Sequence, residues 1–92
     1  MSKTIDGYTY QRSTAKDKKL MVEVDGKTIH FGQMPYTHFR DRTGLLPKYL
    51  NHGDKERRQS YLARTAKIKR KDGTNTANDP TSPNFHARKV LW

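Results

Sequence analysis

Two segments in which hydrophobic and polar residues alternate flank Asp25-Gly26 and predict a β-hairpin. The segments are KKLMVEV, residues 18–24, and KTIHF, residues 27–31. Asp-Gly favours a two-residue type I′ turn, because both central residues of that turn need positive φ. This register places five apolar side chains on one face: Leu20, Val22, Val24, Ile29 and Phe31. The opposite face receives Lys19, Met21, Glu23, Thr28 and His30. A lone hairpin is marginally stable in water, so another element must cover the apolar face.

The residues on either side of the hairpin carry weaker patterns. Residues 1–17 are predicted to form a flexible or extended arm, within which Tyr8–Tyr10 suits a third strand. After the hairpin, Pro35 suits the first turn of a short helix over residues 35–42, because its fixed φ and missing N–H are tolerated there.

The longest helical pattern runs from Asp54 to Lys71, with Asp54 suited to the N-cap and Gly73 to the C-cap. Eight of the seventeen residues 55–71 are Lys or Arg, and one is acidic. At 100° per residue, an arc of about 80° holds Arg57, Ser60, Arg64, Lys67 and Lys71. Another side holds Tyr61, Leu62 and Ile68. We expect the apolar side to pack on the hairpin and the basic side to face outward, although a solvated surface helix has the same pattern.

The composition changes after Lys71. Residues 72–84, DGTNTANDPTSPN, are almost all turn-forming and predict a polar loop at the surface. Ser82-Pro83 then supplies an N-cap and a first-turn proline for a last helix over residues 85–92. Three hydrophobic residues of that helix are expected to dock on this domain or on a neighbouring protein: Phe85, Leu91 and Trp92.

Together these patterns predict an α+β fold in one small domain over residues 1–92. We expect a small antiparallel sheet, either the β-hairpin alone or three strands, packed on one long basic helix, with a short C-terminal helix after a loop. A chain of this length buries only about two-thirds of its unfolded surface. Since 32% of the residues are hydrophobic, the core must be small.

The charge balance indicates an acidic partner. Nineteen Lys and Arg residues against nine Asp and Glu give a formal net charge of +10. No apolar run approaches the roughly 18 residues that suggest a membrane span, and we expect neither a membrane nor a small-molecule substrate as partner. The N-terminal MSKTIDGYTY lacks the apolar region of a secretory signal peptide. The absence of cysteine excludes disulfides and thiolate metal sites.

The sequence favours nucleic acid as that acidic partner, because clustered cations contact phosphates. The candidate binding residues are Arg57, Arg58, Arg64, Lys67, Lys69, Arg70, Lys71, Arg88 and Lys89. Tyr36, Tyr49 and Tyr61 can stack on unpaired bases or pack in the core. No helix-turn-helix, RNP, KH or zinc-finger signature is present, so binding is expected to be electrostatic and largely independent of sequence.

The histidines give little indication of catalysis. They are His30, His38, His52 and His86, and no two of them are spaced i, i+4. We expect His30 on the exposed sheet face, and His38 and His86 at partly exposed helix positions. Each Asp has a simpler role in a turn, cap or loop, and there is no glycine-rich phosphate loop. We therefore expect no enzyme activity, no catalytic residue, no metal and no cofactor.

Three segments together carry a resemblance to a known family. They are Phe31-Gly32 after the hairpin, the basic helix from His52 to Arg64, and the aromatic segment Phe85 to Trp92. Over residues 18–92 the chain resembles a family of small basic proteins of unknown function from tailed phages and large DNA viruses. The resemblance implies a viral origin and supplies no catalytic residues.

These observations lead to one main hypothesis and two alternatives. The main hypothesis is a small, basic, non-enzymatic viral protein that binds nucleic acid through phosphate contacts, in the virion or the host-cell cytoplasm. The first alternative is a virion structural component, such as a minor capsid or cement protein, that latches onto larger capsid subunits. The second is a phage inhibitor of a host protein.

Overall fold

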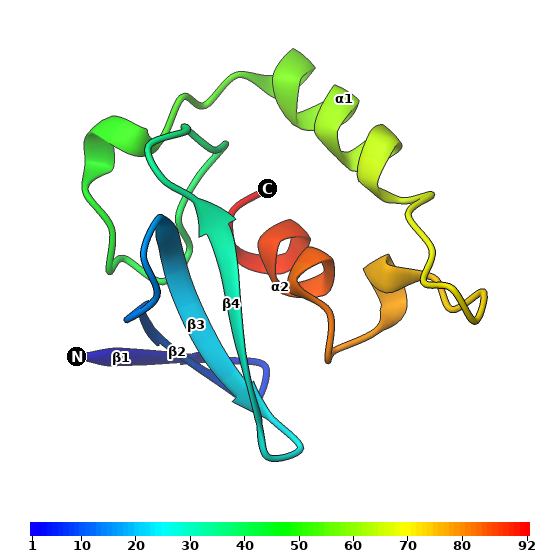
Figure 1. The fold of residues 1–92 in the computed structure, drawn as a ribbon. Coiled ribbons are helices and arrows are strands. Elements are labelled where there is room, and N and C mark those ends of the chain that lie inside the picture. The colour runs from blue at the N-terminus through cyan, green and yellow to red at the C-terminus, as the bar shows by residue number, and fades with distance from the viewer.

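The computed structural model describes residues 1–92 and contains a four-stranded antiparallel sheet with helices on one side (Figure 1). The strands are β1 (Ser2–Ile5), β2 (Tyr8–Arg12), β3 (Lys18–Val24) and β4 (Lys27–Gln33), and they lie in sequence order. The α+β class is therefore confirmed, but the sheet has four strands instead of two or three. Residues 1–17, expected as a flexible or extended arm, form β1 and β2 and pair with the hairpin.

The predicted hairpin register is confirmed. Val22 pairs with Ile29 and Leu20 with Phe31, while the turn residues Asp25 and Gly26 have φ of 52° and 77°. The apolar face predicted from the alternation is buried throughout. One residue of the opposite face differs: Lys19 is only 3% exposed, because its stem packs against Gly32 and its amine reaches His38.

The helix that covers the sheet is α2 (Pro83–Val90), not the basic helix. The hydroxyl of Ser82 accepts a hydrogen bond from the Asn84 N–H, and Pro83 occupies the first turn, as the sequence predicted. From this segment Ala87, Val90 and Leu91 join the core formed by Tyr10 and the apolar hairpin face. Figure 1 shows α2 between the sheet and α1.

The basic helix α1 (Lys55–Thr65) has 11 residues, so the expected single long helix from Asp54 to Lys71 is wrong. It also contributes no residue to the core and does not pack on the hairpin as expected. The helix ends early because later side chains bind the carbonyls that a longer helix would use. Asn84 Nδ2 donates to Thr65 O at 2.8 Å, and Asn75 Nδ2 donates to Ala66 O at 2.9 Å. Continuing the helix would also align Lys67 with Lys71, and like charges at i, i+4 repel.

The segment between β4 and α1 is irregular apart from the 3-10 helix η1 (Lys48–Leu50). The helix predicted over residues 35–42 is absent, because the backbone there pairs with a later segment. His38 N donates to Leu50 O, and His52 N donates to His38 O, both at 2.9 Å. These bonds bury His38 completely, against the partly exposed helix position expected for it.

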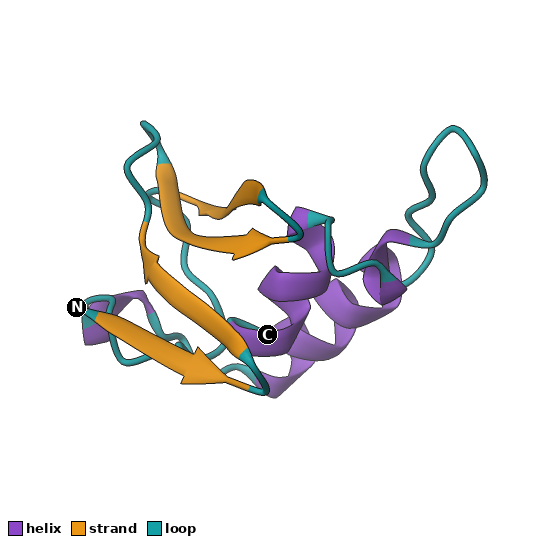
Figure 2. Cartoon of the chain, turned by 90° about the horizontal axis from the view of Figure 1, so that it is seen from below, coloured by secondary structure: helices purple, strands orange, loops and turns teal.

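The polar segment 72–84 is folded against the rest of the chain. It contains the 3-10 helix η2 (Thr76–Asn78) and buries Thr76 and Ser82. Between α1 and η2 lies a segment that we call the basic loop, residues 66–75, which protrudes from the helical side of the molecule in Figure 2.

Candidate nucleic-acid interface

Four of the nine predicted binding cations bind a carboxylate or a backbone carbonyl of their own chain. Arg58 Nε donates to Trp92 O at 2.6 Å, and Arg88 donates to Leu62 O at 2.6 Å. Lys89 pairs with Asp6 at 2.6 Å, and Arg70 pairs with Asp79 at 2.7 Å. The structure has no other ion pair between a Lys or Arg and a carboxylate. These four side chains hold parts of the fold together, so they are less available to a partner.

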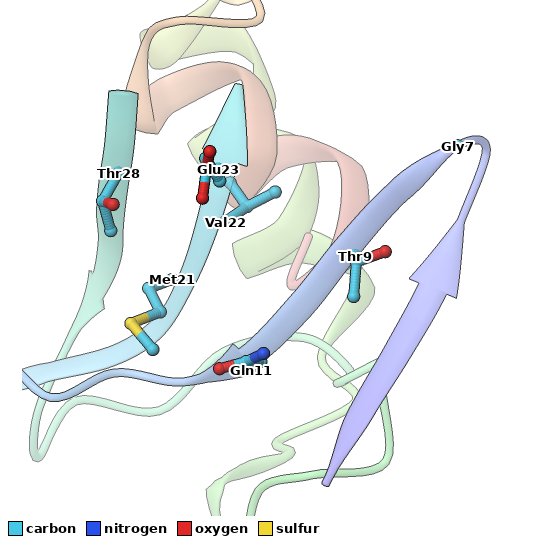
Figure 3. Close-up of a pocket in the computed structure, with 7 residues that line it drawn as sticks. All are labelled: Gly7, Thr9, Gln11, Met21, Val22, Glu23 and Thr28. Atoms are coloured by element: carbon cyan, nitrogen blue, oxygen red, sulfur yellow. The ribbon is translucent and has the colours of Figure 1, made fainter. Parts of the chain in front are cut away.

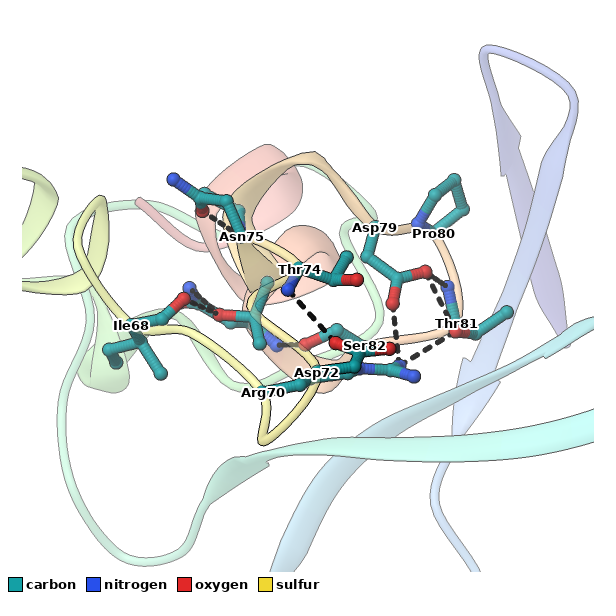
Figure 4. Close-up of polar contacts among 12 residues, drawn as sticks. Ile68, Arg70, Asp72, Thr74, Asn75, Asp79, Pro80, Thr81 and Ser82 are labelled. Carbon is teal, nitrogen blue, oxygen red and sulfur yellow. Dashed lines mark hydrogen bonds and ion pairs between the residues drawn. The ribbon is translucent and has the colours of Figure 1, made fainter.

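The contacts of Arg70 shape the basic loop (Figure 4). Its guanidinium donates to Thr81 Oγ1 at 2.7 Å as well as pairing with Asp79. The Asp79 carboxylate also accepts bonds from Thr81 N and Oγ1, which lower the pKa of Asp79. The Asp72 carboxylate accepts from Thr74 N at 2.9 Å, and this bond lowers the pKa of Asp72. Ordered polar contacts therefore fix the loop on the residues before α2.

The other five predicted cations are exposed and have no carboxylate partner: Arg57, Arg64, Lys67, Lys69 and Lys71. They belong to one stretch of chain, α1 and the basic loop. The guanidinium of Arg64 lies over the Tyr61 ring at 5.6 Å, and Arg57 Nη2 donates to Thr37 Oγ1 at 3.4 Å. We call these five residues the free cations.

Two hollows meet between α1 and the loop that follows β4, with volumes of about 450 and 550 Å³. Each lies within the range of roughly 300–1,000 Å³ typical of ligand pockets. They share five lining residues, among them Tyr36, Tyr61, Arg64 and Trp92, so they form one continuous depression. We call it the aromatic groove and define it by Tyr36, Tyr61, Trp92, Lys18, Arg57 and Arg64.

The predicted docking residues contact their own domain. Trp92 stacks on the Tyr61 ring with a centroid distance of 4.1 Å and an angle of 10°, which joins the chain after α2 to α1. Leu91 is 1% exposed in the core, and Phe85 packs edge-on against Tyr8 at 5.8 Å. Trp92 stays half-buried and lines the aromatic groove.

A chain of buried polar groups lies beneath the groove, and the sequence analysis missed it. Lys19 Nζ donates to His38 Nδ1 at 3.0 Å, because an ammonium group can only donate. His38 therefore carries its proton on Nε2 and donates to Asn51 Oδ1 at 2.7 Å. Burial lowers the pKa of Lys19 to about 8, and burial together with the nearby Lys19 charge lowers the pKa of His38. Both Lys19 and His38 look like surface residues in the sequence pattern, which gives no signal for this pairing.

His86 forms a second buried polar centre in the core. Its Nε2–H donates to Pro80 O at 2.6 Å, since a carbonyl can only accept, and its Nδ1 accepts from the Tyr10 hydroxyl at 2.8 Å. The expected partly exposed position of His86 is wrong, because the residue is 0% exposed. Burial lowers the pKa of His86 and raises the pKa of Tyr10.

His52 has one buried nitrogen without a partner. Its Nδ1 accepts from Asp54 N at 2.8 Å, which leaves the proton on Nε2, and Nε2 has no hydrogen-bond partner. The ring lies against Trp92 at 5.1 Å and Phe39 at 6.2 Å. Burial and the Arg57 charge lower the pKa of His52, so its environment favours the neutral ring.

A separate hollow lies on the outer face of the sheet and is lined mainly by polar residues of β2, β3 and β4 (Figure 3). Glu23 is its single titratable side chain, so the hollow contains no nucleophile–base pair. No group of three His, Asp or Glu residues gathers where a metal ion could bind. Neither helix has the length and hydrophobicity needed to cross a membrane.

Comparisons with protein-family models, curated proteins and solved structures find no match. The resemblance to phage and viral proteins therefore stays a prediction from the sequence.

Proposed function

We propose that this protein binds nucleic acid through phosphate contacts made by the free cations. The observation that supports this proposal is that most basic side chains have no carboxylate partner. A chain of net charge +10 has two ion pairs, and a continuous stretch from α1 through the basic loop presents six exposed cations without carboxylates, namely the five free cations and Lys55. Unpaired like charges repel one another, and a polyanion relieves that repulsion when it binds.

The local structure supports a phosphate-binding role for these side chains. Intramolecular contacts hold Arg70 and Arg88, which fix the basic loop and the end of α1, while their neighbours Lys67, Lys69 and Lys71 remain exposed. Because the backbone is already fixed, binding does not have to order the loop, and the entropic cost of binding is smaller. We therefore infer binding that is mainly electrostatic and tolerant of sequence.

The sequence resemblance leads us to propose a viral setting, in the virion or the host-cell cytoplasm. The alternative of a virion component that latches onto capsid subunits relied on a C-terminal segment available to neighbours. Since Leu91 and Trp92 contact their own domain, that segment gives the alternative no support. No particular contact favours an inhibitor of a host protein, so we retain nucleic-acid binding as the proposal.

The test is a salt titration of binding to a labelled random duplex, followed by fluorescence anisotropy. With four to six phosphate contacts, the log–log slope against salt should be roughly −3 to −5. Replacing Arg57, Arg64 and Lys67 together with Gln should weaken binding and reduce the magnitude of the slope by about 2.7. No binding at low salt would refute the proposal.

A second triple variant supplies the matched control. Lys3, Lys16 and Lys27 are also exposed and without ion pairs, but they lie on the sheet and its turns. Their replacement with Gln lowers the net charge by the same amount, and it should change the slope by less than about 1. Equal effects of the two triple variants would show that net charge alone governs binding, without an interface on α1.

A further inference from the structure

The aromatic groove combines exposed ring faces with cations. Tyr36 is 66% exposed, although tyrosine rings usually bury much of their area. It lines the groove from the loop after β4, and the stacked rings of Tyr61 and Trp92 line the groove from α1 and from the chain after α2. The C-terminal end of the chain lies between α1 and the loop after β4 in Figure 1, which locates the groove in the fold.

The charges along the groove are arranged unevenly. Lys18 lies at the end next to the sheet, and Arg64 lies in the middle, where the two hollows meet. At the other end Arg57 is accompanied by Asp54 and Glu56. Phosphates are therefore attracted most strongly from the middle of the groove toward Lys18, while the two nearby carboxylates weaken the attraction of Arg57.

We propose that the aromatic groove binds unpaired bases of single-stranded nucleic acid, with a base stacked on Tyr36 and phosphates near Lys18 and Arg64. This inference rests on the proposed nucleic-acid binding and adds the form of the nucleic acid. Bases in a duplex are stacked on one another and offer no free ring face to a tyrosine, whereas single strands do. Aromatic platforms beside cations are the usual means by which proteins hold single strands without reading sequence.

An acidic peptide is the competing partner, and the groove fits it less well. A peptide carboxylate would satisfy the cations, but it would leave the exposed Tyr36 ring without a flat partner. A nucleotide chain supplies both negative phosphates and base ring faces, and arginine beside the ring adds a cation–π contribution. The presence of Tyr36 and Arg64 in the lining of the same groove therefore favours a nucleic acid.

The experiment compares an oligothymidine of about 12 nucleotides with a duplex of the same length, using the full chain. Tyr36→Ala should weaken binding of the single strand by roughly 5- to 150-fold and leave duplex binding unchanged. Tyr36→Phe keeps the ring and should bind within about threefold of the parent protein. Tyr49→Ala is the matched control, because Tyr49 is 77% exposed and lies outside the groove, and it should change neither affinity.

Trp92 gives an independent measurement, because it is the single tryptophan and lines the groove. The oligothymidine should quench its fluorescence, whereas the duplex should leave it unchanged. The inference is overturned if Tyr36→Ala leaves single-strand affinity unchanged, or if polyglutamate binds as tightly as the oligothymidine. If Tyr36→Ala bound both nucleic acids as tightly as the parent protein does, the aromatic groove would be excluded as the single-strand binding site. The proposed nucleic-acid binding by the free cations would still hold. If the parent protein bound neither nucleic acid, both the groove proposal and the proposed function would be refuted.

Discussion

Acid should destabilise this protein through its two fully buried histidines, before the carboxylates become protonated. His38 and His86 are both 0% exposed, and burial is the main cause that lowers the pKa of each ring. In the unfolded chain each recovers the ordinary pKa of 6.5. Below that pH the unfolded state binds protons that the folded state excludes. Stability is therefore complete above pH 6.5 and is lost as the pH falls.

The hydrogen bonds of His86 show why protonation is costly. Its two nitrogens contact a carbonyl at 2.6 Å and the Tyr10 hydroxyl at 2.8 Å, with Tyr8, Phe31 and Phe85 packed around the ring. The Lys89 charge adds to the lowering of the pKa of His86, while its bond to Pro80 opposes it. While a histidine stays neutral in the folded state, the free energy of unfolding falls by about 1.4 kcal/mol per pH unit. Between about pH 8 and pH 5 this slope sets an upper limit of about 2 kcal/mol for each histidine, which applies if the ring stays neutral throughout.

The assay is urea denaturation followed by circular dichroism at several pH values from about 8 to about 5, at constant ionic strength. The parent protein should be less stable at about pH 5 than at about pH 8, by at most about 4 kcal/mol through His38 and His86. His86→Gln keeps a donor and an acceptor but cannot titrate, so its stability should fall less with acid than that of the parent protein. His38→Gln should show a similar reduction. A parent protein whose stability does not fall between about pH 8 and pH 5 would refute the reasoning.

Two further substitutions test how α1 is held. Arg88→Met removes the donor to Leu62 O and should lower the free energy of unfolding by about 1–3 kcal/mol in urea denaturation. The adjacent Lys89→Met breaks a pair with the exposed Asp6 and a cation–π contact with the Phe85 ring, and it should cost less, so equal losses would contradict this role for Arg88. Asp54→Ala removes the cap that accepts from Glu56 N and should cost about 1 kcal/mol, measured in the same way. Asp54→Asn retains an acceptor, and a loss as large as that of Asp54→Ala would exclude capping as the cause.

The β-hairpin and the helix N-caps could be predicted because local chemistry determines them, whereas the sheet as a whole, with β1 and β2, could not. The Asp25-Gly26 turn fixes the hairpin register, and Ser82-Pro83 fixes the start of α2. The end of α1 could not be predicted, because it depends on side chains from Asn75 and Asn84 that bind its carbonyls after the chain has folded back. A local pattern of helix-forming residues contains no information about those distant donors.

The candidate site was predictable in its charges but not in its geometry. The sequence identifies all nine cations, yet it cannot separate Arg64, which is exposed, from Arg88, whose guanidinium binds the end of α1. It also places Tyr36 in a predicted helix over residues 35–42 and leaves its burial open, whereas the irregular backbone after β4 leaves its ring exposed in the lining of the aromatic groove. Tertiary contacts made by His38 determine the exposure of Tyr36, because the backbone pairing of His38 with residues 50–52 replaces the predicted helix.

Lys19 connects the buried polar chain to the electrostatics of the aromatic groove. Its pKa of about 8 lies below the ordinary 10.5, so the charged amine costs about 3 kcal/mol of stability near neutral pH. Because burial disfavours the charged amine, this stability cost is complete below about pH 8 and disappears as the pH rises toward 10.5. At pH 7 the amine is still mainly protonated, it lines the groove, and no carboxylate pairs with it. A buried, unpaired cation thus adds positive potential beneath the site that we assign to phosphate, where a low dielectric strengthens its effect.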